Sequence, residues 1–197
     1  MFRGVCLLLF LLLACPPMAE SQERASGKTV RKISYPNGAL KTVCEYSAGL
    51  LDGSCKTYSK SGKLFIENIY AADMQTGSTM FFESGKVQRV SMFQNGKMSG
   101  PTTGYYESGR VQFEAMFEGG KAAGYAREYY ETGRLKSEVT YKDGKPDGPM
   151  RQYYESGKLR FETVFNNGES VGGWKEYDEK GRLREIKMED DTGKNLF

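Results

Sequence analysis

Apolar and polar residues alternate in short runs that end at glycine. Met150–Tyr154 is aromatic and extended, and Glu155–Lys158 is a turn, because its glycine takes a positive φ without a Cβ clash. Leu159–Phe165 runs back, with residues two apart on one face. Asn166–Gly168 turns the chain again, and Asn-Gly is the strongest short-range signal of a β-hairpin. This pattern predicts two antiparallel strands per unit.

The same hairpin recurs along most of the chain. The glycines of the first turn lie 24, 23, 24, 24, 24 and 24 residues apart, and a second series keeps the same period. The first series is Gly38, Gly62, Gly85, Gly109, Gly133, Gly157 and Gly181; the second is Gly53, Gly77, Gly100, Gly124, Gly148 and Gly172. Two markers in phase indicate a repeat protein. The sequence therefore predicts an all-β, elongated antiparallel meander of hairpin units, with about a dozen strands.

Aromatic residues recur in two columns with the period of the glycines. One column is Tyr58, Phe81, Tyr105, Tyr129, Tyr153 and Tyr177; the other is Tyr46, Tyr70, Phe93, Phe117, Tyr141 and Phe165. We expect rings on neighbouring units to stack and to form the core, since aromatic side chains bury a large area and aliphatic residues are scarce. The alternative is a platform that binds a ligand, for which Tyr105, Tyr129, Tyr153 and Tyr177 are the candidate residues.

Charged residues also recur, and composition limits the chemistry available to them. Glutamates recur next to the turns (Glu83, Glu107, Glu131, Glu155), with a cation across each turn (Lys86, Arg110, Arg134, Lys158), and a second series is Glu67, Glu114, Glu138 and Glu162. Because these residues repeat in every unit, they indicate a solvated face rather than one active site. The chain has no histidine, which excludes imidazole bases and ligands, and its net charge of +3 gives no electrostatic case for nucleic acid. The sequence predicts no enzyme, no cofactor and no metal site.

The N-terminus has the pattern of an export signal. Residues 1–14 combine one cation, Arg3, with an apolar run that is too short to span a bilayer. The run ends in Leu-Leu-Ala before Cys15, which is similar to the lipobox of bacterial lipoproteins and implies acylation of Cys15. The alternative is ordinary cleavage after Ala19. Residues 15–29 are polar and small, and we expect a flexible tether there.

Two further cysteines lie within the repeat frame. Cys44 and Cys55 flank the turn of the first hairpin symmetrically, which places them opposite each other on adjacent strands. In an exported chain such a pair is expected to form a disulfide. A zinc site fits less well, because two thiolates without histidine or further cysteine leave zinc without enough ligands.

The unit Tyr-Tyr-Glu-Ser-Gly-Lys-Leu-x-x-Glu-x-x-Phe/Tyr-x-x-Gly-Lys-x-x-Gly resembles the MORN-repeat variant, a family of bacterial exported and lipoprotein-like proteins that is also described as antitoxin-like. The unit is clearest over 129–148 and 153–172. The unit at 58–77 departs from it, because Tyr70–Met74 lacks the Gly-Lys pair. The resemblance implies a hairpin array over 30–188, followed by a polar tail or cap over 189–197.

Family resemblance and repeat pattern together favour a non-enzymatic scaffold that binds a protein partner in the cell envelope. The lipid anchor would attach it to a membrane, and the expected location is the outer membrane, facing the periplasm; otherwise the protein is periplasmic or secreted. Two alternatives remain open: a module that binds lipid or cell-wall glycan, and a toxin-neutralising protein.

Overall fold

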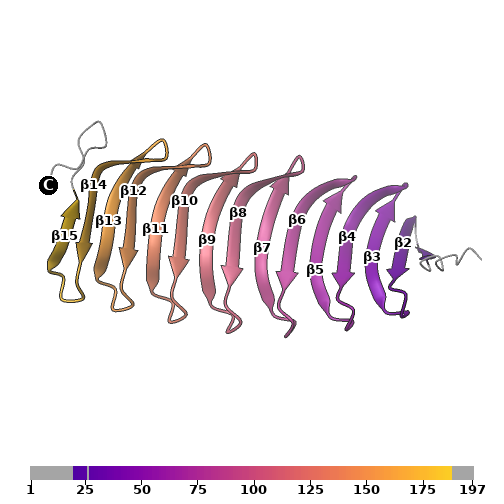
Figure 1. Ribbon diagram of the computed structural model, residues 1–197. Helices are drawn as coiled ribbons and strands as arrows, with labels where there is room; N and C mark the ends of the chain where they lie inside the picture. Colours follow the sequence, from indigo (N-terminus) through magenta and orange to yellow (C-terminus); the bar gives the residue numbers. More distant parts are fainter. Residues whose placement is uncertain (1–19, 26, 188–197) are drawn as a thin grey trace, which may run out of the picture.

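The fold is one open antiparallel sheet in which every strand pairs only with its neighbours in the chain (Figure 1). The computed structural model describes residues 20–25 and 27–187, and this part of the chain forms 15 strands. They are β1 (Glu20–Ala25), β2 (Lys28–Ser34), β3 (Leu40–Ser47), β4 (Leu50–Tyr58), β5 (Leu64–Ala71), β6 (Met74–Phe81), β7 (Val87–Gln94), β8 (Lys97–Tyr105), β9 (Val111–Glu118), β10 (Lys121–Tyr129), β11 (Leu135–Lys142), β12 (Lys145–Tyr153), β13 (Leu159–Asn166), β14 (Glu169–Tyr177) and β15 (Leu183–Lys187). The predicted all-β meander is confirmed.

The first glycine series lies in the turns that connect the strands at one end of the hairpins. In the turn between β12 and β13, the amide of Tyr154 donates to the carbonyl of Lys158, and the amide of Gly157 donates to the carbonyl of Tyr154, both at 2.8 Å. Gly157 has φ of 87°, a conformation that glycine adopts without a Cβ penalty. The same two hydrogen bonds recur in all the turns of this series, from the one that begins at Tyr35 to the one that begins at Asp178. The positions predicted for these turns are therefore confirmed.

The turns at the other end of the hairpins contain two residues, both with positive φ, as the type I′ turn requires. Asn167 and Gly168 have φ of 50° and 93°. In the unit that lacks Gly-Lys, Ala72 and Asp73 take the same conformation, with φ of 47° and 67°. The departure from the family pattern therefore changes the residues of this turn but not its geometry.

The second glycine series lies inside strands, at bulges. Between the pairs Ala122–Phe117 and Ala126–Ala115, strand β10 has three residues where β9 has one. Gly124 lies in this bulge with φ of 73°, and such bulges bend a strand and increase its twist. In β6 the bulge is one residue shorter, because Gln75 and Gly77 pair with consecutive residues of β5. The missing residue accounts for the 23-residue spacing.

The sheet begins earlier than the sequence predicted. Residues 15–29 were expected to form a tether, whereas residues 20–25 form β1 and β2 begins at Lys28. Main-chain pairing of β1 with β2 explains this, because a short polar strand gains ladder hydrogen bonds without needing an apolar face. The predicted signal over 1–14, the lipidation of Cys15 and the tail over 189–197 lie outside the described residues.

The sheet is a single layer, and this corrects the expected core of stacked rings. None of the described apolar side chains is fully buried, and the most enclosed polar ones are Ser91, Thr102 and Thr163. The ring pair that stacks is Phe161 with Trp174, whose centroids lie 5.8 Å apart. The aromatic columns are half-buried. Repeating hydrogen bonds, described below, join the units where ring stacking was expected.

Candidate functional site

The two faces of the sheet carry different side chains. Residues directly opposite each other on adjacent strands share a face, so the register defines a continuous row on what we call the ladder face. This row is Lys56, Glu67, Thr79, Val90, Thr103, Glu114, Arg127, Glu138, Arg151, Glu162, Lys175 and Ile186. We call the other face, which carries Cys44 and Cys55, the disulfide face.

Acids and bases alternate along the ladder row from β9 to β14. Glu138 lies between two arginines, with its carboxylate 3.7 Å from Arg127 Nε and 3.6 Å from Arg151 Nη1. Lys175 Nζ lies 3.5 Å from Glu162 Oε1. These side chains are partly exposed, so each pair contributes only a few tenths of a kcal/mol, about 0.5. The second glutamate series thus forms the solvated charged face that the sequence predicted.

Three tyrosines of the first aromatic column donate a hydroxyl hydrogen bond to a glutamate of this row. The pairs are Tyr129 with Glu114 (3.0 Å), Tyr153 with Glu138 (3.0 Å) and Tyr177 with Glu162 (2.9 Å). Burial, and then the hydrogen bond to the carboxylate, raise the pKa of Tyr129 and Tyr153. For Tyr177 the hydrogen bond to Glu162 is the first cause of the raised pKa.

Tyr105 differs from these three tyrosines. The residue that precedes it by 15 positions is Val90, which offers no acceptor, whereas glutamate holds that position in the next three units. All four candidate binding residues (Tyr105, Tyr129, Tyr153, Tyr177) are half-buried at the ends of strands. Three of them already use the hydroxyl within the sheet. A ligand role for these tyrosines remains a prediction.

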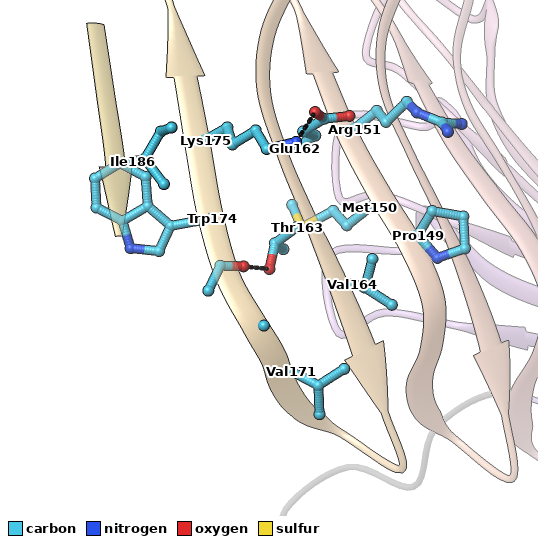
Figure 2. Close-up of a pocket in the computed structure, with 12 residues that line it drawn as sticks. Pro149, Met150, Arg151, Glu162, Thr163, Val164, Val171, Trp174, Lys175 and Ile186 are labelled. Atoms are coloured by element: carbon cyan, nitrogen blue, oxygen red, sulfur yellow. Dashed lines mark hydrogen bonds and ion pairs between the residues drawn. The ribbon is translucent and has the colours of Figure 1, made fainter. Parts of the chain in front are cut away.

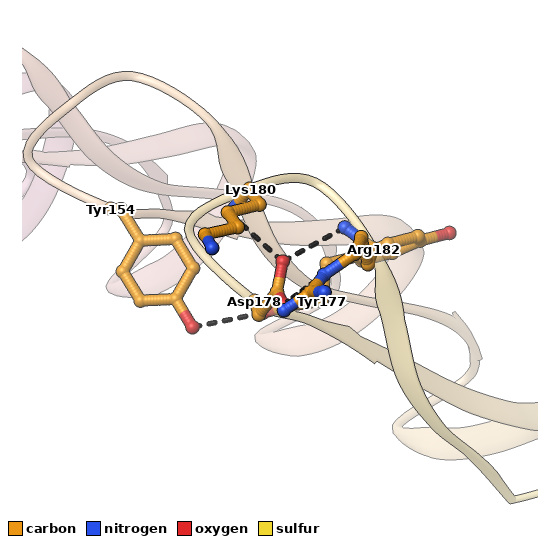
Figure 3. A network of polar contacts seen from close by, with 5 residues as sticks. All are labelled: Tyr154, Tyr177, Asp178, Lys180 and Arg182. Carbon is orange, nitrogen blue, oxygen red and sulfur yellow. Dashed lines mark hydrogen bonds and ion pairs between the residues drawn. The ribbon is translucent and has the colours of Figure 1, made fainter.

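A second set of tyrosines joins four of the turns to the next unit. Tyr154 Oη donates to the carbonyl of Tyr177 at 2.8 Å (Figure 3), and Tyr35, Tyr106 and Tyr130 make the equivalent bond. Figure 3 also shows Asp178, which accepts from the amides of Lys180 and Arg182 and from Arg182 Nε. The hydrogen bond from the Arg182 main-chain amide is the main cause of the lowered pKa of Asp178.

Cations of the turns also reach forward to the next unit. They donate to the main-chain carbonyl of the next turn glutamate rather than to its carboxylate. The pairs are Lys86 with Glu107, Arg110 with Glu131 and Arg134 with Glu155, at 2.8, 2.8 and 2.7 Å. Side chains therefore link one turn to the next at this end of the hairpins. This use of the predicted charges is structural.

The ladder face carries a second row of side chains, two residues from the first row, that was not predicted from the sequence. Each of its members lies two residues along the strand from a member of the ladder row, and residues two apart in a strand lie on the same face. We call it the apolar row: Ile69, Met92, Pro101, Met116, Tyr125, Pro149 and Val164, interrupted by Ser54, Gly77 and Thr140. Ile69, Met92, Tyr125 and Val164 are 40–51% exposed. The signal that would have found it is the apolar residue two positions after three of the four glutamates of the second series, Glu67, Glu114 and Glu162.

At the C-terminal end of the ladder face, the two rows enclose a hollow of about 300 Å³ across β12–β15 (Figure 2). Pro149, Val164 and Val171 lie on one side, and the ion-pair side chains of Arg151, Glu162 and Lys175 lie on the other. Ile186 of β15 closes one end. Val164, Val171 and Ile186 are 47, 42 and 43% exposed. The hollow therefore offers apolar contacts beside both signs of charge.

The disulfide face carries the predicted bridge. Cys44 and Cys55 are directly opposed in the register of β3 and β4, and they form a disulfide. The geometry expected from the repeat frame is confirmed. On this face Arg31 stacks over the ring of Tyr46, with its guanidinium carbon 4.4 Å from the ring centroid.

Among residues 20–25 and 27–187, no group of three or more histidine, cysteine, aspartate or glutamate side chains has the arrangement of a metal site. The same residues include no helix of the length and hydrophobicity needed to cross a membrane. The hollow at β12–β15 is the candidate site.

The fold and this surface define a class of protein, a β-hairpin repeat protein with an open, single-layer sheet. Within that class, the MORN repeat variant family matches residues 124–143 and 146–167. Two adjacent units of the sheet therefore match MORN-variant repeats, and over these residues the resemblance inferred from the sequence is confirmed. These residues lie in β10–β13 and the turns between them.

No curated protein matches the chain. Among solved structures, one similarity is to a mutant of S. aureus TarM in complex with fondaparinux, alpha-GlcNAc-glycerol and UDP. It has 11% identity over 60% of this chain and 19% of that chain, with a TM-score of 0.27. Another is to the GtfA/B complex bound to UDP and GlcNAc, with 12% identity over 85% of this chain and 28% of that chain, and a TM-score of 0.25. This chain spans less than a third of either.

Proposed function

We propose that the protein is a non-enzymatic scaffold that binds a partner protein at the hollow across β12–β15. The observation that carries the proposal is the group of exposed apolar side chains Val164, Val171 and Ile186 beside the ion pairs of the ladder row. Exposed apolar groups rimmed by polar residues are typical of protein interfaces. The outer edge of β15 pairs with no other described strand, so an extended segment of the partner has main-chain groups to pair with.

The charges of the hollow favour a protein over an anionic lipid surface. Attraction to such a membrane needs an excess of cations. Here Arg151 lies 3.6 Å from Glu138 and Lys175 lies 3.5 Å from Glu162, so each cation is accompanied by an acid. A partner protein presents both signs of charge and matches such a row. Binding of lipid or cell-wall glycan is the second candidate function.

We further propose that this scaffold acts in the cell envelope, on the strength of the signal pattern over 1–14 and of Cys15 in its lipobox-like context. An acylated Cys15 would hold the protein at the outer membrane, facing the periplasm. A toxin-neutralising role would use the same hollow with a toxin as the partner.

The test is capture of envelope proteins by the immobilised full chain, with Cys15→Ser to prevent acylation, followed by gentle crosslinking. We expect one partner to be retained by this protein and lost with Val171→Asp or Val164→Lys. Leu50→Asp is the matched control, because Leu50 is 43% exposed, like Val171, but lies at the start of β4. Equal loss with the control contradicts the proposal. Cosedimentation of the same chain with anionic vesicles or peptidoglycan, without a protein partner, would favour the second candidate.

A further inference from the structure

The charge alternation of the ladder row is interrupted near the middle of the sheet. Between Glu67 on β5 and Glu114 on β9, the row consists of Thr79, Val90 and Thr103. Neutral residues thus occupy three adjacent strands, with charged residues on either side. We call the ladder face of β6–β8 the neutral window.

The apolar row crosses the neutral window and leaves large apolar side chains in solvent. Met92 is 51% exposed and Val90 is 38% exposed, two residues apart on β7. Gly77 on β6 is paired with Met92 on one side and with Ile69 on the other. A monomeric surface rarely keeps contiguous apolar groups of this kind without a partner.

We propose that the neutral window is a self-association surface, on which a second copy of the chain packs its own ladder face. The twofold axis lies parallel to the strands, between β7 and β8. This symmetry places β7 on the partner's β8, β6 on the partner's β9, β5 on the partner's β10 and β4 on the partner's β11. It also places the ladder row on the ladder row and the apolar row on the apolar row.

Charge complementarity identifies the occupant. With this axis, Glu67 faces the partner's Arg127, and Lys56 faces the partner's Glu138. By symmetry each contact occurs twice, so four pairs of opposite charge surround the neutral window. A twofold axis through β7 would instead place Glu67 against the partner's Glu114 and Lys56 against the partner's Arg127. Like charges at these places would oppose association.

The apolar rows also match in size under the same symmetry. Met92 faces the partner's Pro101, and Ile69 faces the partner's Tyr125. Gly77, which has no side chain, faces the partner's Met116. The glycine therefore leaves room for a methionine, and apolar side chains face apolar side chains at the other two positions, which favours close packing.

The area is that of an ordinary stable interface. Eight strands, β4–β11, spaced about 4.8 Å apart, span about 38 Å. A contact about 20 Å wide along the strands then covers about 800 Å² of each copy, which is the standard size. The hollow across β12–β15 lies outside this contact.

Self-association goes beyond the proposed function, since a scaffold can bind its partner as a monomer or as a dimer. The test is sedimentation equilibrium of the full chain carrying Cys15→Ser, over a concentration series. We expect a dimer, and Met92→Lys should raise its dissociation constant at least about tenfold. Val164→Lys is the matched control, because Val164 belongs to the same row and is 47% exposed but lies outside the contact. This control should leave the dimer unchanged.

A charge exchange tests the position of the axis. Glu67→Lys and Arg127→Glu should each weaken the dimer at least about fivefold, and the two together should restore it to within about threefold. Arg151→Glu should have a similar effect on the fold, because Arg151 also lies opposite two glutamates. It should leave the dimer intact, because under this symmetry Arg151 faces the partner's Val43, an uncharged residue that lies opposite Lys56 in the register. A monomeric protein at all concentrations, or equal effects of Met92→Lys and Val164→Lys, overturns the inference. Loss of partner capture with Val164→Lys in an intact dimer separates the two proposals.

Discussion

Strands β3–β8 and strands β9–β14 share one backbone plan but are held together by different side chains. In the C-terminal strands, tyrosine hydroxyls and an acid–base row repeat in every unit. In the N-terminal strands, Tyr35 makes the equivalent bond to Tyr58, but Ser59 and Phe82 stand where Tyr106 and Tyr130 make a bond to the next unit. The disulfide Cys44–Cys55 cross-links these strands instead. The turns therefore specify the fold, and the side-chain contacts between units are interchangeable.

The largest expected effect is removal of the disulfide. Cys44→Ala with Cys55→Ala frees a loop of about 12 residues, for which chain entropy gives about 3 kcal/mol. We expect hydrogen exchange to accelerate in β2–β5 and to stay slow in β11–β13, because each strand contacts only its neighbours. Uniform acceleration along the sheet would contradict the division into two regions.

The next effect concerns the hydroxyl bridges between units. Tyr130→Phe removes the bond to the carbonyl of Tyr153, which is 2.8 Å long and half-buried, and should lower the free energy of unfolding by about 1 kcal/mol. Phe82→Tyr should add the equivalent bond to the N-terminal strands and raise stability by less than that. Urea denaturation measures both. Tyr141→Phe is the control, because its hydroxyl has no hydrogen bond among the described contacts; an equal loss there would assign the effect to the ring.

A smaller effect is expected from the acid–base row. Glu138→Gln weakens two ion pairs and the bond from Tyr153, yet these groups are partly exposed, so the loss should be about 0.5 kcal/mol. Added salt should reduce the difference between the variant and the unmodified protein. A loss several times larger that is insensitive to salt would show that the row is more than a solvated face.

The smallest effect is a dependence on alkaline pH that is confined to the C-terminal strands. Folding raises the pKa of Tyr129, Tyr153 and Tyr177 above the ordinary value near 10. The folded state therefore holds these protons more tightly than the unfolded state. Their contribution is present below about pH 10 and is lost as pH rises through the folded pKa. The urea midpoint should therefore decrease as pH rises above about 10, and it should decrease less when all three tyrosines are replaced by phenylalanine.

Turns and pairing were predictable from the sequence because they depend on local backbone chemistry. Glycine at a fixed period specifies where the chain reverses, and two cysteines placed symmetrically about a turn specify their own pairing. The turn at Ala72–Asp73 was harder to predict, because neither residue favours positive φ as glycine does. Its conformation follows from the pairing of β5 with β6, which is a property of the whole ladder.

The apolar row was missed for a different reason. Its members are chemically varied, from Pro101 to Tyr125, so no single residue type marks every unit. The bulges also insert residues into each strand, so counting from a turn does not show which residues lie opposite each other. Burial could not be predicted either, since a single layer leaves both faces in solvent and provides no enclosed core.

Each described strand pairs only with the strands before and after it in the sequence. One 24-residue unit can therefore be added or removed as a whole. Duplication or deletion of a unit would lengthen or shorten the sheet by two strand spacings, about 10 Å, without disturbing the register elsewhere. The one-residue deletion in β6 is absorbed within a bulge in the same way. Evolution can therefore adjust the reach of such a protein in regular steps.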